Sequence, residues 1–164
     1  MLKITIICAF TKNRAIGKDG KIPWFIPEEM AHFKKTTIGG AVIFGMNTFL
    51  GINKVLPGRF NIVLSHSKKI KMEGLHVVSS FVQAIELCKK NGFTDIFICG
   101  GSEVYCSALK EKICTNMILS ELDEKFLPLT KDADSFFPDF DKKEWTCTKK
   151  EKHSDFTVYF YSKL

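Results

Sequence analysis

The sequence lacks any long hydrophobic run. Its longest uncharged apolar stretch covers residues 4–10, far short of the roughly 20 residues that a membrane-spanning helix needs. One lysine precedes this stretch and no small-residue cleavage pattern follows it, which argues against a secretory signal. The chain has 164 residues, of which 45% are hydrophobic and 26% charged, so it is not a disordered or low-complexity chain. We therefore expect a buried first strand, no membrane association, and one domain over residues 1–164.

Cysteine pairs and metal-ligand spacings are also missing. The six cysteines form no Cys-x-x-Cys pair, and no histidine stands at metal-binding spacing from them. Most of them lie within apolar runs, where a thiol packs as a small hydrophobic side chain. We expect no metal site and a cytoplasmic protein whose cysteines are reduced core residues: Cys8, Cys88, Cys99, Cys106, Cys114 and Cys147.

Arginine is scarce. Arg14 and Arg59 are the only arginines among 24 basic residues, which outnumber 18 acidic residues and give a net charge of +6. Because a planar fork for carboxylate or phosphate needs arginine, these two residues stand out individually. The lysines are scattered, and their densest group, Lys68, Lys69 and Lys71, has no interleaved aromatic residues. The charge favours anionic partners in general and gives little support to nucleic-acid binding.

Strand-like and helical patterns alternate through the first two thirds of the chain. Pro27-Glu28-Glu29 is typical of a helix start, Ser80-Phe81-Val82-Gln83 of a capping box, and a further helix is expected over residues 102–109. Residues 11–26 are expected to form a long functional loop. Strands dominate later, with no helical stretch between them. The expected strands are residues 3–10, 41–44, 60–64, 75–78, 95–99, 116–122, 144–150 and 157–162.

This order predicts an α/β protein in which parallel crossover units are completed by an antiparallel pair at the C-terminal edge of a mixed sheet. Ligands bind such sheets beyond the carboxyl ends of the parallel strands. Here those ends are Ala9-Phe10, Gly45-Met46, Ser65-His66 and Gly100-Gly101. We expect the functional site along this edge.

Two features near these strand ends have both a structural and a functional interpretation. Gly100-Gly101 is either only a turn or a place where backbone amides approach a phosphate closely. Glu28 and Glu29 either complement the helix dipole in water or place one carboxylate in an apolar cleft. Glu29 stands one turn from Phe33, so the two can line one wall and bind a planar pair of donors.

Several other polar or aromatic residues are ambiguous on the same grounds. Trp24 either anchors its loop on the core or contacts a ligand. Arg59 lies in a turn, where an arginine is usually a solvated charge. No partner residue stands at a suitable spacing from the histidines, and we interpret them as surface or packing residues: His32, His66, His76 and His153.

A series of ordered segments nevertheless resembles the dihydrofolate reductase family. Each segment is weakly specific alone, but their order and spacing span essentially the whole chain. The resemblance implies a three-layer α/β fold with a mostly parallel, eight-stranded mixed sheet flanked by helices and antiparallel strands at the C-terminal edge. It also implies NADPH-dependent reduction of 7,8-dihydrofolate to tetrahydrofolate. The segments are Ala15-Ile16-Gly17, Ile22-Pro23-Trp24 and residues 27–34, 42–49, 56–65, 99–105 and 134–138.

On the substrate side, the resemblance implies that Glu29 is the acidic group of the pterin pocket, with Ser120 hydrogen-bonded towards it. Arg59 would hold the glutamate α-carboxylate of the substrate. The expected partners are dihydrofolate and antifolate inhibitors, and we expect a monomer. The other implied substrate contacts are Ile7, Cys8, Met30, Phe33, Ile52, Leu56, Cys99 and Tyr105.

On the cofactor side, residues 17–24 correspond to a mobile flap over the nicotinamide of NADPH. Ile22 would face the pocket from this flap, and we count Ile22 and Trp24 with Glu29 and Ser120 as catalytic. Closure of the flap would exclude water from the hydride path. The implied cofactor contacts are Ala9, Ile16, Gly45, Met46, Asn47, Thr48, Leu64, Ser65, His66, Cys99, Gly100, Gly101, Ser102, Glu103, Val104 and Tyr105.

Two departures from the family pattern concern the 2′-phosphate of the cofactor. Members usually have arginine or lysine where Met46 stands, and another common basic position holds Glu103 here. The grip on the phosphate then falls to residues 65–68, with His66 as the candidate cation and Lys68 as a second one, or it is weak.

Two alternative functions remain open on the sequence. A pyrimidine reductase of riboflavin biosynthesis has the same fold, but Glu29 with Phe33, Trp24 and Arg59 argues against it. A basic nucleic-acid-binding domain has only the scattered lysines in its support. Filter binding of nucleic acid at several salt concentrations tests this last alternative, because real phosphate contacts make the binding constant fall steeply with salt.

Overall fold

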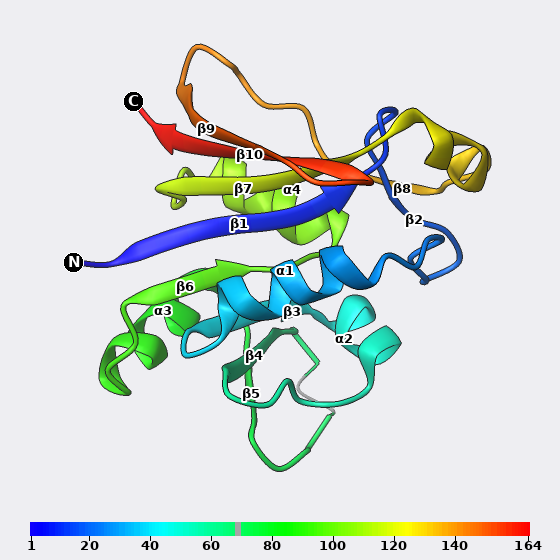
Figure 1. Ribbon diagram of the computed structural model, residues 1–164. Coiled ribbons are helices and arrows are strands. Elements are labelled where there is room, and N and C mark those ends of the chain that lie inside the picture. The colour runs from blue at the N-terminus through cyan, green and yellow to red at the C-terminus, as the bar shows by residue number, and fades with distance from the viewer. Residues whose placement is uncertain (68–69) are drawn as a thin grey trace.

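The computed structural model describes residues 1–67 and 70–164. Its centre is an eight-stranded sheet with the order β5-β4-β3-β6-β1-β7-β10-β9 (Figure 1). The strands from β5 to β7 are parallel, and β10 and β9 complete the sheet in antiparallel fashion. The mixed sheet with antiparallel C-terminal strands is therefore confirmed. The strands are β1 (Lys3–Phe10), β3 (Ala41–Gly45), β4 (Phe60–Leu64), β5 (Leu75–Val78), β6 (Asp95–Ile98), β7 (Asn116–Leu122), β9 (Trp145–Lys152) and β10 (Phe156–Lys163).

Helices cover both faces of this sheet (Figure 1). The helices α1 (Pro27–Thr37) and α2 (Met46–Ile52) lie on one face, and α3 (Phe81–Lys90) and α4 (Ser102–Lys110) lie on the other. Side chains of β1 alternate between the two layers, as the period of a strand requires. Ile6 and Cys8 pack with the α3 and α4 layer, whereas Ile7 packs with Phe33 and Phe49 of α1 and α2. These are the three expected layers.

The start of α3 confirms half of the predicted capping box. The Ser80 hydroxyl accepts a hydrogen bond from the Gln83 amide at 3.1 Å. The Gln83 side chain, however, does not return to the Ser80 amide. Its Oε1 accepts from the amide and the hydroxyl of Ser79, at 2.8 and 2.9 Å. The neighbouring serine offers two donors instead of one, and the helix keeps its N-terminus where the sequence placed it.

Two segments expected to be irregular contain regular structure. Within the predicted loop 11–26, β2 (Ala15–Gly17) pairs antiparallel with β8 (Ser135–Phe136). Strands this short carry no readable alternation, and their partner lies far away in the sequence, so local pattern could not reveal them. The expectation of no helical stretch among the later strands was also wrong. A 3-10 helix, η1 (Glu124–Thr130), contains Pro128 and follows β7.

The cysteines are only partly as predicted. Cys8, Cys88 and Cys114 are buried, but Cys106 and Cys147 are exposed. Cys106 lies on the outer side of α4, and Cys147 lies on the edge strand β9 between the exposed residues Thr146 and Thr148. In the described part of the chain, no group of three or more potential ligands could hold a metal ion. No helix in that part is long and apolar enough to cross a bilayer.

Candidate functional site

An apolar wall forms where β1, α1 and α2 meet beyond the strand ends. Most of the predicted ring contacts belong to this wall, which extends the buried cluster around Phe49 and Val63. Met46, expected on the cofactor side, packs against the same cluster. The structure thus brings together residues that lie far apart in the sequence. The predicted substrate contacts in this wall are Ile7, Phe33, Ile52, Leu56 and Cys99.

Glu29 lies in the first turn of α1 and is half-buried, while its neighbour Glu28 is exposed. Pro27 sets the start of the helix, so Glu29 and Phe33 fall one turn apart along the same face. Burial raises the pKa of Glu29 from 4.5 to about 7. A solvated carboxylate at a helix N-terminus would not show this rise. The geometry favours the interpretation in which Glu29 faces the cleft.

Arg59 is held in a fixed orientation by two hydrogen bonds. Its Nε donates to the Pro57 carbonyl at 3.0 Å, and its Nη1 donates to the Thr37 hydroxyl at 3.2 Å. Burial lowers the pKa of the guanidinium, which nevertheless keeps its charge and three free N–H donors. A partly buried, oriented fork with unused donors is suited to a carboxylate.

The turn that carries Arg59 depends on a residue that the sequence analysis missed. Asn61 is 2% exposed, and its Oδ1 accepts from the Leu56 amide at 2.8 Å. Its Nδ2 donates to the carbonyls of Leu56 and Arg59 at 3.0 and 2.9 Å. An asparagine inside an otherwise apolar strand was the signal, since a buried amide needs partners of this kind. Thr37, the partner of Arg59, gave no comparable signal.

Ser120 and Ala9 lie side by side in the sheet, because β7 pairs with β1 in that register. Ser120 is buried, and on its other side it pairs in register with Val158 of β10. Trp24 is 9% exposed and packs in the cluster that contains Val158 and Phe156. Of its two interpretations, the structure supports the loop anchor. Trp24 therefore anchors the segment that leads into α1 on the core.

Cys8 and Tyr105 do not belong to the apolar wall. Both are buried in the cluster on the α3 and α4 side of the sheet. The Tyr105 hydroxyl donates to the Ile7 carbonyl at 2.7 Å, which fixes the end of β1. Burial raises the pKa of Cys8 to about 12, so the thiol stays protonated. The charge of Glu29 raises the pKa of both groups further, and their contact with substrate stays a prediction.

Two predicted contacts project into solvent. Met30 is 54% exposed and Ile22 is 65% exposed. Ile22 lies in the predicted flap, where Lys18 and Lys21 pair their backbones and Asp19 and Gly20 both have positive φ. This is the geometry of a tight two-residue hairpin turn. The flap thus projects outward as a hairpin with an apolar side chain near its end.

The base of this flap is fixed by a residue of the later chain. Asp134 accepts a hydrogen bond from the Asp19 amide at 3.0 Å, and its own amide donates to the Gly17 carbonyl at 3.2 Å. Lys18 lies 3.6 Å from a carboxylate oxygen of Asp132. The segment before β8 therefore holds both the start of the flap and Asp19 in its turn.

The cofactor side is a corner made largely of backbone. Gly45 and Gly100 meet through a 2.7 Å hydrogen bond from the Gly45 amide. A Cβ at Gly101 would stand 2.8 Å from Thr48 Oγ1, and one at Gly45 would stand 2.9 Å from Val104 Cγ2. The helices α2 and α4 begin here without side-chain caps. Their free amides lie beside glycines that permit close approach, which favours the anion-binding interpretation of Gly100-Gly101.

The remaining cofactor predictions are spread unevenly. Ser102 donates its hydroxyl to the Phe136 carbonyl at 2.8 Å, and so ties α4 to β8. The hydroxyls of Ser65 and Ser67 lie 3.0 Å apart beyond β4. Lys68 and Lys69 lie outside the described residues. Ile16 and Leu64 pack against the core on the α4 side, whereas Asn47, His66 and Glu103 are exposed.

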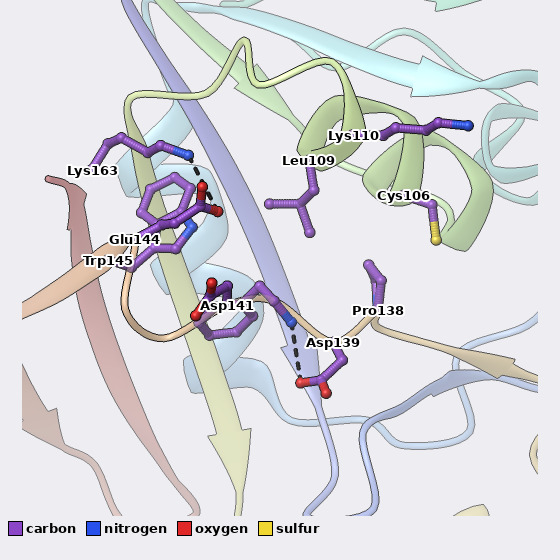
Figure 2. Close-up of a pocket in the computed structure, with 10 residues that line it drawn as sticks. Cys106, Leu109, Lys110, Pro138, Asp139, Asp141, Glu144, Trp145 and Lys163 are labelled. Atoms are coloured by element: carbon purple, nitrogen blue, oxygen red, sulfur yellow. Dashed lines mark hydrogen bonds and ion pairs between the residues drawn. The ribbon is translucent and has the colours of Figure 1, made fainter.

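A separate surface pocket of about 330 Å³ lies between α4 and the segment before β9 (Figure 2). Its wall contains Trp145, with Lys163 3.8 Å from Glu144 at its edge. None of the predicted site residues lines this pocket. The candidate site is the cleft beside Glu29, and the pocket is distinct from it.

Comparison with known proteins agrees with this arrangement. The family model described as dihydrofolate reductase matches residues 3–162. The chain belongs to the dihydrofolate reductase family. It is 32% identical to the dihydrofolate reductase of Bacillus subtilis, with 98% of this chain and 94% of the relative covered. It is 38% identical to that of Neisseria gonorrhoeae, covering 88% and 85% of the two chains.

A solved structure extends the likeness to three dimensions. Dihydrofolate reductase from Enterococcus faecalis, in complex with NADP(H) and RAB-propyl, superposes with a TM-score of 0.82 at 28% identity. The match covers 98% of this chain and 96% of that one. The resemblance inferred from the ordered segments is confirmed, and with it the predicted function, NADPH-dependent reduction of dihydrofolate.

Proposed function

We propose that the cleft beside Glu29 reduces 7,8-dihydrofolate to 5,6,7,8-tetrahydrofolate with NADPH, the reaction of the dihydrofolate reductase family. The observation that carries this proposal is a carboxyl group whose pKa burial raises to about 7, placed beside an apolar wall. That wall suits planar rings, and the carboxyl suits the pair of N–H donors on one edge of a pterin. Antifolate inhibitors with the same donor pair would compete for this place.

Glu29 would orient the ring and favour protonation at N5. A carboxyl group near half-ionisation at neutral pH can accept two hydrogen bonds when charged and hold a proton when neutral. Both states lie within reach because burial has moved the pKa of Glu29 to the working pH. Ser120, buried on the neighbouring strand, is the proposed hydroxyl partner on this side of the pocket.

The far end of the substrate would be held by Arg59. Phe33 and Leu56 lie in the apolar wall between the two charged groups, so a long flat substrate can bridge from Glu29 to Arg59. Two hydrogen bonds already orient the guanidinium, which reduces the entropy lost when a carboxylate binds. This arrangement gives the substrate one direction in the cleft.

The residues on the cofactor side fit a dinucleotide pyrophosphate. Gly45, Gly100 and Gly101 form a surface that a Cβ would obstruct, next to Thr48 and the uncapped start of α4. NADPH supplies the hydride when bound there, and the protein orients it and excludes water. Fewer groups suit the 2′-phosphate, because Met46 packs into the core and Glu103 carries the wrong charge.

We further propose that residues 1–164 act as one domain, as a monomer in the cytoplasm. The substrate and cofactor sides both come from one chain, so a second copy is not needed to complete the site. Free, exposed thiols at Cys106 and Cys147 are suited to a reducing compartment. Analytical ultracentrifugation of the pure protein checks the oligomeric state.

One assay tests the proposed function directly. Purified protein mixed with NADPH and dihydrofolate should cause the near-ultraviolet absorbance of reduced nicotinamide to fall. Omission of either compound should abolish the change. A protein that binds NADPH but leaves it unoxidised in the presence of dihydrofolate would refute the proposal.

A further inference from the structure

The first turn of α1 carries Glu29 but has no side-chain cap. Ile26 occupies the N-cap position, and the amides of Glu29 and Met30 both donate to its carbonyl at 3.1 Å. Apolar residues are poor N-caps, and an uncapped helix start is easily frayed. The position of Glu29 therefore depends on what holds this turn from outside.

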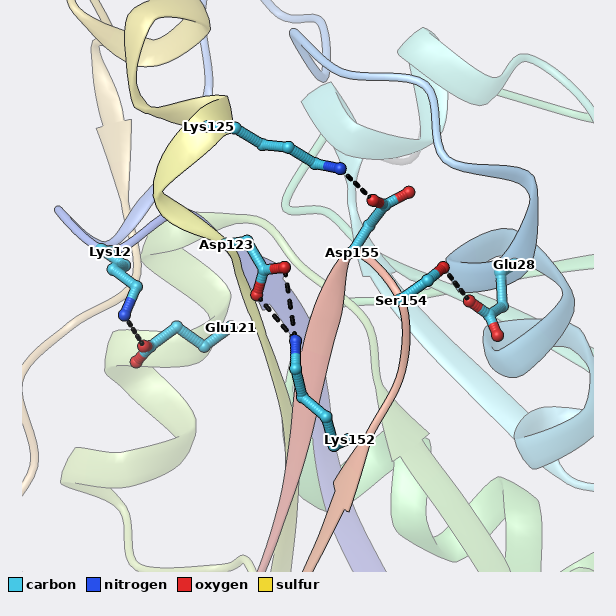
Figure 3. Close-up of polar contacts among 8 residues, drawn as sticks. All are labelled: Lys12, Glu28, Glu121, Asp123, Lys125, Lys152, Ser154 and Asp155. Atoms are coloured by element: carbon cyan, nitrogen blue, oxygen red, sulfur yellow. Dashed lines mark hydrogen bonds and ion pairs between the residues drawn. The ribbon is translucent and has the colours of Figure 1, made fainter.

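Glu28 is held by the turn that connects β9 to β10. Its Oε2 lies 3.2 Å from Nδ1 of His153. Its Oε1 accepts a 3.2 Å hydrogen bond from the Ser154 hydroxyl (Figure 3). Both carboxylate oxygens are engaged, so the side chain cannot rotate freely. The contact joins the start of α1 to a hairpin more than 120 residues later in the chain.

The hairpin side of this contact is rigid. The His153 ring stacks on Phe156 with centroids 4.5 Å apart and planes 5° apart. The His153 amide donates to the Phe156 carbonyl at 2.8 Å. Phe156 is fully buried and packs in one cluster with Trp24 and Ile26, the segment that leads into α1. The hairpin therefore contacts the start of α1 twice, through Phe156 in the core and through the contacts with Glu28 at the surface.

The charges around His153 favour the contact with Glu28. His153 Nε2 lies 3.6 Å from Glu151 on β9, and the His32 ring of α1 lies 6.2 Å from the His153 ring. Glu151 is paired with Lys149 at 2.6 Å. The hydrogen bond from His153 lowers the pKa of Glu28, so the carboxylate is ionised at neutral pH. Two of the four histidines that sequence analysis treated as unrelated, His32 and His153, therefore lie next to each other.

We propose that Glu28, His153 and Ser154 form a clamp that positions α1 and keeps Glu29 buried in the cleft. The clamp residues are positioning residues, since none of them lies in the apolar wall. The inference rests on the proposed function, because the position of Glu29 matters to catalysis only if Glu29 acts. When the clamp opens, the uncapped turn can move outward and water reaches the Glu29 carboxyl.

The first test measures Glu29 without any ligand or turnover. The carboxyl carbon of Glu29 is titrated by NMR in the wild type, in Glu28→Ala and in Ser154→Ala. Because burial raises the pKa of Glu29, both variants should lower its titration midpoint, Glu28→Ala by about half to one pH unit. An unchanged midpoint in Glu28→Ala would overturn the proposal. If that variant does not fold, Ser154→Ala, which loses one hydroxyl, decides on the same criterion.

Lys152→Ala is the matched control. Lys152 precedes His153 in the same hairpin and pairs with Asp123 at 3.0 Å, away from α1 (Figure 3). Its loss disturbs the hairpin surface but leaves both contacts to Glu28. The Glu29 midpoint should stay at the wild-type value. A shift in Lys152→Ala as large as in Glu28→Ala would show that any change in the hairpin suffices, and the clamp would be rejected.

Kinetics separate failure of the clamp from failure of the proposed function. Glu28→Ala should lower kcat/KM for dihydrofolate by about threefold to tenfold, with the KM for NADPH unchanged. Glu28→Gln keeps an acceptor and should recover part of the loss. Equal losses for both ligands would contradict a clamp on α1. A shifted Glu29 midpoint combined with normal turnover in Glu29→Gln would retain the clamp and refute the role of Glu29.

Discussion

The two proposed sides of the cleft would recognise their ligands by different means. On the proposed substrate side, the recognising groups would be the side chains of Glu29 and Arg59, which are held by burial or by hydrogen bonds. On the cofactor side they are mainly backbone groups near Gly45, Gly100 and Gly101. The substrate side therefore depends on residue chemistry, and the cofactor side on the absence of side chains.

This difference also concerns charge. Arg59 is a fixed cation at the proposed substrate end, whereas on the proposed cofactor side Met46 packs against the core and Glu103 is exposed. Helix amides attract an anion without a formal charge, and their effect is weaker and of shorter range than that of an arginine. We expect substitutions on the substrate side to have the larger effects.

The largest effect is expected from Glu29→Gln. The amide has the same shape but cannot accept a pair of donors or carry charge, so turnover near pH 7 should fall by at least about a hundredfold. Activity should recover in part at low pH, where solvent protonates the substrate. Steady-state turnover measured across pH provides the check. A value at pH 7 within about threefold of wild type, or ~0.7 kcal/mol of barrier, would remove Glu29 from this role.

The same substitution should stabilise the ligand-free protein at alkaline pH. The pKa of Glu29 is raised from 4.5 to about 7, so the folded state holds a proton that the unfolded state has released. The free energy of unfolding of the wild type therefore falls as pH rises through this range, by at most about 3 kcal/mol. Glu29→Gln lacks this loss. Urea denaturation should show the variant more stable above pH 7 and equal to wild type near pH 4.5; equal stability throughout would contradict burial as the cause.

Arg59→Lys should raise the KM for dihydrofolate and leave that for NADPH nearly unchanged. A lysine cannot make two parallel hydrogen bonds to a carboxylate, and the expected loss is about 1–3 kcal/mol. A substrate without the glutamate tail provides the control, because it should not respond to the change. If tailed and tailless substrates lose affinity equally, Arg59 does not hold the tail.

Gly101→Ala tests whether the cofactor side depends on an absent side chain. The new Cβ would stand 2.8 Å from Thr48 Oγ1, so the Thr48 side chain must move and the methyl group would occupy the surface that the pyrophosphate approaches. The Kd for NADPH should rise by about tenfold, while that for dihydrofolate changes little. Fluorescence titration measures both constants, and Ser107→Ala on the exposed side of α4 is the control. An unchanged Kd for NADPH would mean that backbone approach at Gly101 is not required.

The contrast between the two sides explains what the sequence could predict. Strands such as β1 and β3 are recognisable because buried parallel strands are apolar throughout, and α1 because proline and two acids mark its start. The local pattern left Glu29 and Arg59 ambiguous, and the resemblance to the family gave them their predicted roles. The burial of Glu29 and the fixed orientation of Arg59, however, arise from the folded structure, which local sequence pattern does not show.

What the sequence could not show was pairing between distant short segments. Nothing local indicates that β2 pairs with β8, or that His153 lies against Glu28. Asn61 gave a readable signal, a buried amide in an apolar strand, whereas Asp134 at the base of the flap looks like any loop acid. These contacts are selected by tertiary packing, which overrides local pattern.

The smallest effect concerns the choice between NADPH and NADH. With Met46 and Glu103 at places where the family usually has basic residues, the preference for NADPH should be modest. His66, exposed beyond β4 beside Ser65, is the proposed cation for the 2′-phosphate. An imidazole is charged only in its protonated form, and a bound phosphate favours that form. The preference should therefore be strongest in mild acid and fade as pH rises.

The measurement is the NADPH to NADH ratio of kcat/KM at about pH 6 and about pH 8.5, in the wild type and in His66→Ala. The wild-type ratio should fall several-fold between these values, and the ratio of the variant should be low and flat. Because Ser65 and Ser67 keep their hydroxyls in the variant, a small preference should survive. A wild-type ratio that is large at both pH values, or a variant that matches it, would mean that another residue holds the phosphate. The cofactor side would then contain a charged side chain that binds the phosphate, and it would differ from the substrate side only in degree.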